Sequence, residues 1–222
     1  MPDDTPAIIA YDEHLPMITT HMKNIVSFFE QERTLNEGHL PIIYAIKSRT
    51  KNKQHLKDKI ERKCREKRII IDAENLLDEV TDLAGIRVLH MHQNQFGKIH
   101  EFIMNLVDRG DLRLKEKPIA YTWDPESKGY FEGFDLELKV KPSYYTSIHY
   151  LLLPANNSNN VCCEVQVRTL FEEIWGEIDH SLNYPHPTDN LACKEQLRVL
   201  AKLVSTGTRL ADSIFRLHEE SK

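Results

Sequence analysis

The spacing of hydrophobic residues changes twice along this chain, and the two changes limit the folds open to it. Near the start, Ile18, Met22, Ile25 and Phe29 recur every three or four residues, as on the buried face of a helix. From about residue 68 the apolar runs become short, rich in β-branched residues, and separated by helical stretches. After about residue 170 the helical spacing returns. This order predicts helices at both ends of the chain and a sheet between them.

The same patterns give approximate element boundaries. We expect a first helix from about 5 to 33, broken or bent near Pro16, and a second helix after Pro41. Further helices are expected over 53–64, 73–80, 95–108, 170–182 and 190–217, and strands over 85–91, 113–123, 134–141, 146–153 and 161–169.

The fold class expected from these elements is α/β (α+β), with a central mixed sheet of about five strands flanked by helices. A chain of 222 residues is long enough for one domain with a sizeable core and short for two. We therefore expect a single domain over 1–222. Its N-terminal helices would cover about 5–65, its sheet core about 68–169, and its C-terminal helices about 170–217.

Composition excludes several classes of protein. Hydrophobic residues make up 41% and charged residues 28%, which is ordinary globular usage and far from that of a disordered chain. The first residues lack a signal-peptide pattern, and no apolar run is long enough to cross a bilayer, so a cytoplasmic location is expected. None of the four cysteines forms a CxxC pair, so all are expected to be ordinary buried or partly buried thiols.

Charge is distributed unevenly along the chain. The stretch 47–68 contains eleven Lys or Arg residues and three acidic residues, although the whole chain has a net charge of −5. Such a run is often a solvated helix face with i, i+4 ion pairs. A polyphosphate ligand is the competing explanation, and other parts of the sequence have to decide between them.

Two successive predicted strands each place polar side chains on one face. Glu164, Gln166 and Arg168 alternate with valines in the last strand, and Tyr145 and His149 share a face of the strand before it. One polar row is typical of the solvated side of an edge strand. Two neighbouring rows with a carboxylate, a cation, a histidine and a tyrosine indicate instead the floor of a pocket.

A second carboxylate extends this pattern. Asp82 precedes the strand that contains Arg87. If the strands are neighbours, Asp82 and Glu164 could share a Mg²⁺ ion, with water and substrate phosphates as its other ligands. Such a site would suit phosphoryl transfer, in which catalysis consists mainly of positioning and of neutralising charge. The sequence has no GxxxxGK[ST] or GxGxxG loop, so a P-loop kinase or a Rossmann enzyme is not indicated.

Four segments together resemble the RelA/SpoT (p)ppGpp synthetases, and in particular their small single-domain members. They are SRTK with the lysines that follow it (48–59), DLAGIRV (82–88), YTSIH (145–149) and EVQVRTLFEEIWGEIDHSLNY (164–184). Their order and spacing follow the synthetase domain over roughly residues 40–185. The resemblance implies a nucleotidyltransferase-like mixed sheet.

The resemblance also implies roles on the side that binds ATP. Arg49 and Arg87 match the two guanidinium groups that sandwich the adenine, and Lys51 and Lys59 match the residues that hold the phosphates. Asp82 matches the Mg²⁺ ligand.

On the acceptor side, Glu164 matches the second acidic residue, which lies near the 3′-hydroxyl and binds metal or takes its proton. Tyr145 matches the ring that stacks on the acceptor base, and Lys141 and His149 match residues near the acceptor's 5′ phosphates. Gln166 and Arg168, which share the strand face of Glu164, are expected on this side too.

The reaction implied is attack of the acceptor 3′-oxygen on the β-phosphorus of ATP, with AMP leaving and Mg²⁺ neutralising the developing charge. Small synthetases of this family are often homotetramers, so the resemblance is compatible with a homo-oligomer, but helices 5–33 and 190–217 could equally pack only within one chain. The hydrolase domain of the long members has no counterpart in this sequence, so the chain is expected to make the alarmone without degrading it.

One departure from the family keeps other functions open. The family usually has asparagine and then glycine before the stacking tyrosine, whereas this chain has Ser143 and Tyr144. The acceptor could therefore be GTP, GDP, GMP, an adenosine nucleotide or the 3′ end of tRNA, the last two being acceptors of toxic small alarmone synthetases. A nucleotide- or RNA-binding module without catalysis is the alternative of another class, but it would have less need of two carboxylates beside a polyanion.

Overall fold

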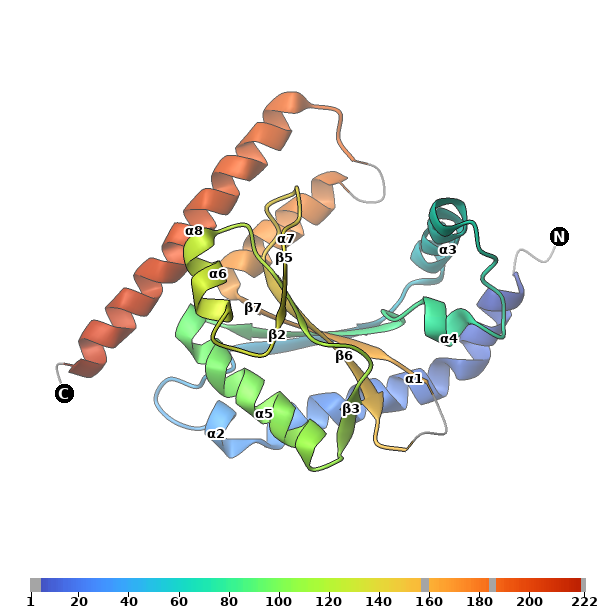
Figure 1. The fold of residues 1–222 in the computed structure, drawn as a ribbon, viewed down its shortest axis with the longest axis horizontal. Coiled ribbons are helices and arrows are strands. Elements are labelled where there is room, and N and C mark those ends of the chain that lie inside the picture. Colours follow the sequence, from blue (N-terminus) through green and yellow to red (C-terminus); the bar gives the residue numbers. More distant parts are fainter. Residues whose placement is uncertain (1–4, 157–159, 184–186, 221–222) are drawn as a thin grey trace.

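A seven-stranded mixed sheet forms the centre of the computed structural model, which describes residues 5–156, 160–183 and 187–220 (Figure 1). The strand order is β1-β2-β7-β6-β4-β5. Strand β3 pairs with the second half of β6, and β4 pairs with the first half of the same strand. The pairs β2–β7 and β4–β5 are parallel and the others antiparallel. The strands are β1 (Ala45–Thr50), β2 (Ala84–His90), β3 (Leu112–Leu114), β4 (Ile119–Tyr121), β5 (Glu137–Lys139), β6 (Ser147–Pro154) and β7 (Cys163–Thr169).

Helices lie on both faces of this sheet (Figure 1). Helix α1 contacts β1, β2 and β7 from one face, and α7 contacts β2 and β7. The helices are α1 (Pro6–Gln31), α2 (Arg33–Asn36), α3 (Lys53–Lys67), α4 (Leu76–Glu79), α5 (Phe96–Asp108), α6 (Pro125–Phe131), α7 (Leu170–Asn183) and α8 (Leu191–Glu220), with a 3₁₀ turn η1 (Gln93–Gln95).

The alternation of side chains in the central strands decides which face becomes the core. Ile86 and Val88 of β2 and Val165 and Val167 of β7 are completely buried, and they belong to the same hydrophobic core as the buried face of α1. The residues between them point to the opposite face. That face is left for polar side chains, and α3 and α7 rise on either side of it (Figure 1).

The expected fold class is confirmed, but the expected number of strands was wrong. The helix expected after Pro41 is absent, and β1 occupies 45–50 instead, paired along its whole length with β2. Tertiary pairing overrides a local pattern that is weak in this polar edge strand. The strand expected over 113–123 is two strands, β3 and β4, because the chain bends before Pro118, which has no N–H group to donate to a ladder.

Two smaller expectations also changed. The first helix runs without a break through Pro16, which is exposed, and residues on both sides of it, including Tyr11 and Ile18, are buried in the core. The helix expected over 73–80 is reduced to α4. All four cysteines are free thiols, and burial raises the pKa of Cys162 to about 12, so this thiol stays protonated at neutral pH. Within the described residues, no helix is long and apolar enough to cross a membrane.

The last two helices pack on each other around a small second core. Trp175 of α7 is buried against Ala201 and Val204 of α8, and its indole Nε1 donates a hydrogen bond to the carbonyl of Leu197 at 2.9 Å. Tyr144 packs against the same cluster. Helix α8 is therefore joined to the polypeptide just before β6, as well as to α7.

Candidate active site

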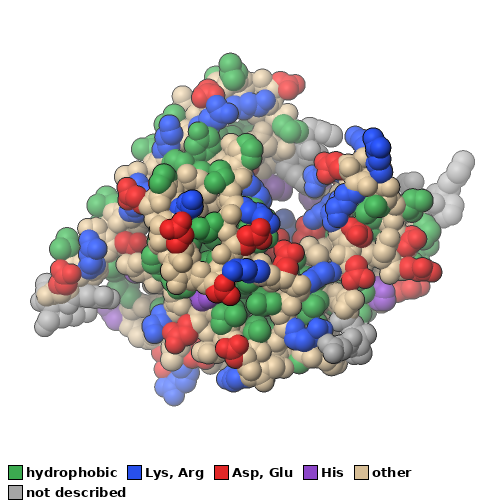
Figure 2. All heavy atoms as spheres, viewed as in Figure 1, with side chains coloured by type: hydrophobic (Ala, Val, Ile, Leu, Met, Phe, Trp, Pro, Cys, Tyr) green, Lys and Arg blue, Asp and Glu red, His purple; other side chains and the backbone are tan. Residues whose placement is uncertain are grey.

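A cleft of about 760 Å³ lies over the polar face of the sheet, between α3 and α7. Figure 2 shows the hollow, with Lys and Arg side chains along its border. Its lining contains every residue that the sequence nominated for a site, namely Arg49, Lys51, Lys59, Asp82, Arg87, Lys141, Tyr145, His149, Glu164, Gln166 and Arg168. The fold therefore brings residues from five separate segments of the chain to one place.

Parallel pairing of β2 with β7 brings the two carboxylates into this cleft. Gly85 pairs with Glu164, and Arg87 pairs with Gln166. Asp82 lies just before β2, so it reaches the same end of the strand pair as Glu164. Both acids line the cleft and lie on one side of the sheet.

Asp82 is held by two lysines. Its Oδ2 lies 2.7 Å from Nζ of Lys51, and its Oδ1 lies 2.8 Å from Nζ of Lys59. Burial raises the pKa of Asp82, but the two ammonium groups more than offset this and hold it below its usual range. The carboxylate is therefore ionised at neutral pH.

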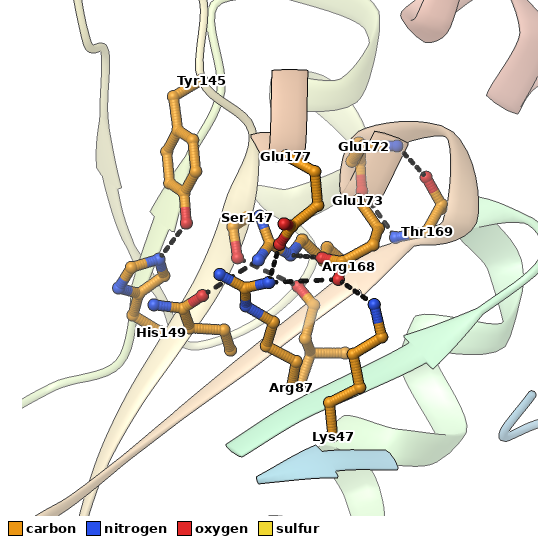
Figure 3. Close-up of polar contacts among 12 residues, drawn as sticks. Lys47, Arg87, Tyr145, Ser147, His149, Arg168, Thr169, Glu172, Glu173 and Glu177 are labelled. Atoms are coloured by element: carbon orange, nitrogen blue, oxygen red, sulfur yellow. Dashed lines mark hydrogen bonds and ion pairs between the residues drawn. The ribbon is translucent and has the colours of Figure 1, made fainter. Parts of the chain in front are cut away.

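Glu164 is part of a short hydrogen-bonded chain. Nδ1 of His149 lies 3.1 Å from Oε1 of Glu164, and the amide of Gln166 donates to Oε2 at 2.6 Å. The hydroxyl of Tyr145 lies 2.9 Å from Nε2 of the same histidine (Figure 3). Burial raises the pKa of Glu164, but its contacts with His149 and Gln166 lower it further than burial raises it. A proton on Nδ1 of His149 would donate to Glu164 and would leave Nε2 to accept from Tyr145.

These two acids suit a hard cation. No group of three or more acidic, histidine or cysteine side chains that could hold a metal occurs in the described part of the chain. Mg²⁺ is commonly held by only one or two carboxylates together with water and substrate phosphates. Asp82 and Glu164 supply two ionised oxygen ligands in the same cleft, so the donor set fits this ion.

A third acid, which sequence reasoning missed, organises the cations on the other side of the cleft. Glu173 of α7 lies 2.8 Å from Nζ of Lys47, 3.1 Å from Nη1 of Arg87 and 2.9 Å from Nε of Arg168 (Figure 3). Glu177, one turn further along α7, also contacts Arg87. The helical spacing of the two glutamates was the one available signal, because i and i+4 share a helix face.

The arginines of the cleft differ in their burial and in their contacts with other side chains. Arg49 lines the cleft from β1, where it pairs with Gly85. Arg168 is 2% exposed, binds Gln166 Oε1 at 3.3 Å in addition to Glu173, and lies so close to Gly176 that a Cβ there would meet its Nη1 at 2.6 Å. It therefore forms part of the wall.

The expected acceptor side is aromatic. Nζ of Lys141 lies 4.0 Å from the ring centre of Tyr121 and 4.4 Å from that of Tyr145. These are cation–π distances. Burial lowers the pKa of Lys141. Tyr121 was not nominated from the sequence, because its strand pairs with β6 across a connection that the pattern does not reveal.

Tyr144 has an unusual backbone conformation, with φ at 65°. Its ring packs edge-on against Trp123 with the centroids 4.9 Å apart, and the guanidinium of Arg198 lies 6.0 Å from its centre. A left-handed residue directly before Tyr145 explains why a glycine would suit this position.

Comparisons with known proteins place the chain in a family. The family model described as "Region found in RelA / SpoT proteins" matches residues 48–189. The chain is 27% identical over 162 residues to GTP pyrophosphokinase YwaC of Bacillus subtilis (strain 168), a match that covers 71% of this chain and 66% of that protein. It is 23% identical over 218 residues to GTP pyrophosphokinase YjbM of the same organism, covering 96% of this chain and 87% of the relative.

A solved structure shows a similar fold over nearly the whole chain. The crystal structure of small alarmone synthetase 1 from Bacillus subtilis superposes with a TM-score of 0.69 at 21% identity, covering 95% of this chain and 98% of that one. The extent of the match indicates that the two chains share their fold over most of their length.

Proposed function

The chain belongs to the RelA/SpoT family, and on that premise we propose that it transfers pyrophosphate from ATP to the 3′-hydroxyl of GTP or GDP. AMP would leave, and the product would be (p)ppGpp. The observation that carries the proposal is the presence of two ionised carboxylates, Asp82 and Glu164, in one cleft lined with lysines and arginines. Such a cleft can bind a polyanionic substrate and a hard cation, and one of its carboxylates can accept a proton.

The donor nucleotide would occupy the half of the cleft between β1, β2, α3 and α7. Lys51 and Lys59 offer ammonium groups to the phosphates, and Arg49 and Arg87 offer planar guanidinium groups to the adenine. Mg²⁺ held by Asp82 and Glu164 would neutralise charge on the polyphosphate oxygens.

The acceptor would occupy the half of the cleft next to β6. Tyr145 supplies an aromatic face for the guanine, and Lys141 and His149 lie beside it for the phosphates. Glu164 is the proton acceptor for the 3′-hydroxyl in this arrangement. Its lowered pKa keeps it ionised, His149 holds Oε1 and Gln166 holds Oε2, and the remaining lone pairs of these oxygens can accept the proton.

The outer surface of the C-terminal helices supports a homo-oligomer. Large hydrophobic side chains are exposed along one side of α7 and along α8, and an apolar stripe of this length is commonly covered by another protein surface. They are Phe171, Ile174, Ile178 and Leu182 on α7, and Leu191, Val199, Leu203, Leu210, Ile214 and Leu217 on α8. We propose a cytoplasmic enzyme that assembles through these helices.

The test supplies the protein with ATP labelled in its β- and γ-phosphates and, in separate reactions, GTP, GDP, ATP or deacylated tRNA. The expected result is label transferred to GTP and GDP with one AMP released for each transfer. Label on ATP or tRNA would identify one of the other acceptors, and nucleotide binding without transfer would identify a binding module.

Two substitutions locate the chemistry. Asp82→Asn and Glu164→Gln should each lower kcat by at least about a hundredfold, the usual scale for loss of a group that acts on the transition state. Asp78→Asn is the matched control, because Asp78 is an exposed carboxylate of α4 that pairs with Lys115 outside the cleft. Wild-type turnover in either cleft variant would refute the proposed site.

A further inference from the structure

Glu173 is a buried acid that contacts three cations from three neighbouring strands. Its side chain is 6% exposed. Lys47 comes from β1, Arg87 from β2 and Arg168 from β7, and these strands are adjacent in the sheet. A buried carboxylate with three partners is constrained more strongly than a surface ion pair, whose two side chains exchange partners freely.

The cations that Glu173 contacts have different surroundings. Arg168 is almost completely buried and packs against Gly176, so it fixes Glu173 from inside the protein. Arg87 lines the cleft and is about one quarter exposed. Glu173 therefore connects a buried arginine to one that lines the cleft.

The two glutamates hold Arg87 by an edge of its guanidinium group and not by its planar face. Glu173 and Glu177 both approach its Nη1, which lies at an edge of the guanidinium plane (Figure 3). Carboxylates bind such edges, whereas aromatic bases stack on the face. An arginine fixed at its edge is thus prepared for stacking, while a free one would lose side-chain entropy on binding.

We propose that Glu173 is a positioning residue for the donor purine, acting through Arg87. The proposal rests on the proposed function, in which Arg87 stacks on the adenine of ATP. Glu177 contributes less, because its side chain is 51% exposed and its interaction with Arg87 is screened by water.

Electrostatics alone gives the opposite expectation, and this makes the proposal testable. Replacing Glu173 with glutamine removes a negative charge near the site for a triphosphate. By Coulomb's law this would strengthen the binding of any polyanion. If the variant binds ATP more weakly but binds a polyphosphate without a base at least as well, the loss reflects the position of Arg87 and not a change in charge.

The experiment measures binding by titration calorimetry of α,β-methylene ATP, in which the bond cleaved in the reaction is blocked, and of inorganic tripolyphosphate. The proteins compared are the wild type, Glu173→Gln, Glu177→Gln and Glu101→Gln, with folding checked by circular dichroism. Glu101 is the matched control, since it is an exposed acid of α5 that pairs with Lys98. Glu173→Asp, which keeps the charge but shortens the side chain, replaces Glu173→Gln if that variant fails to fold.

We expect Glu173→Gln to weaken binding of the ATP analogue about tenfold or more, as loss of a hydrogen bond between charged groups does. Glu173→Gln should bind tripolyphosphate as tightly as the wild type or more tightly. Glu177→Gln should change the affinity for the analogue less than threefold. Glu101→Gln should change the affinity for neither ligand. Unchanged or tighter binding of the analogue, or equal weakening of both ligands, would overturn the proposal. If the wild type does not bind the ATP analogue, both the proposed function and this inference are overturned. If the wild type makes (p)ppGpp and Glu173→Gln binds the analogue as well as the wild type does, only this inference is overturned.

Discussion

Tyr144 offers a direct measurement of backbone strain next to the acceptor site. Its φ of 65° lies in the left-handed region, which costs a residue with a Cβ about 1–2 kcal/mol and costs glycine almost nothing. The perturbation is a pair of variants, Tyr144→Ala and Tyr144→Gly. Both lose the ring that packs against Trp123, so they differ only in the backbone term.

The neighbouring residue supplies the reference. Ser143 is exposed and its φ is not positive, so alanine there should be more stable than glycine by about 0.4–1 kcal/mol, the entropy that glycine adds to the unfolded chain. At position 144 the backbone strain of alanine opposes that entropy. The glycine variant should therefore be as stable as the alanine variant, or more stable by up to about 1.5 kcal/mol in free energy of unfolding. The entropy cancels in the difference between the two sites, which leaves the strain of about 1–2 kcal/mol.

The assay is urea unfolding of the four variants, followed by tryptophan fluorescence and circular dichroism. Equal m-values would show that the same two states are compared in each case. The reasoning is refuted if alanine is more stable than glycine by the same amount at both positions. That result would mean that residues 143 and 144 have the same backbone preference and that the tyrosine is accommodated without strain.

Two further substitutions test contacts that hold the site and the last helix in place. Gly176→Ala should destabilise the protein by about 1–3 kcal/mol in thermal unfolding, because the new Cβ would meet Nη1 of the buried Arg168. Gly129→Ala in α6 is the control, because a Cβ there meets nothing within 4 Å. It should be neutral or stabilising in the same measurement. Asp124→Asn should cost about 1–3 kcal/mol at pH 7, since the carboxylate accepts hydrogen bonds from Ser127 and Arg209 and joins α6 to α8. Burial raises the pKa of Asp124, but these partners lower it below its usual value, so its contribution is complete above about pH 4 and is lost as the pH falls through the folded-state pKa. The difference between wild type and Asp124→Asn should therefore shrink in unfolding curves below pH 4, and a constant difference would contradict this assignment.

Residue alternation was sufficient to predict the floor of the cleft. Polar and apolar residues alternate through β7 and at the start of β6, so His149, Glu164 and Gln166 could be placed on polar strand faces before their partners were known. The parallel pairing of β2 with β7 was not visible, because the chain passes through four other strands and two helices between them. That the two strands are neighbours was only a condition of the predicted metal site, and the pairing itself was not predicted.

The contacts of α7 could not be predicted in the same way. Glu173 lies 126 residues from Lys47 and 86 from Arg87 along the chain, and no local pattern encodes such pairs. Strand β1 was missed for a related reason. Its residues are mostly polar, so its position is determined by its pairing with β2 and not by an apolar period of its own.

The acids of the cleft have a role in the fold that precedes any role in catalysis. Two unit positive charges ~5 Å apart repel each other by about 3 kcal/mol at an effective dielectric constant of ~20. Lys51 and Lys59 approach one carboxylate, Asp82, so their mutual repulsion is offset in the free protein. Glu173 does the same for Lys47, Arg87 and Arg168. These acids therefore offset the repulsion among the cations before a ligand arrives, and a polyphosphate that enters the cleft exchanges one set of negative partners for another.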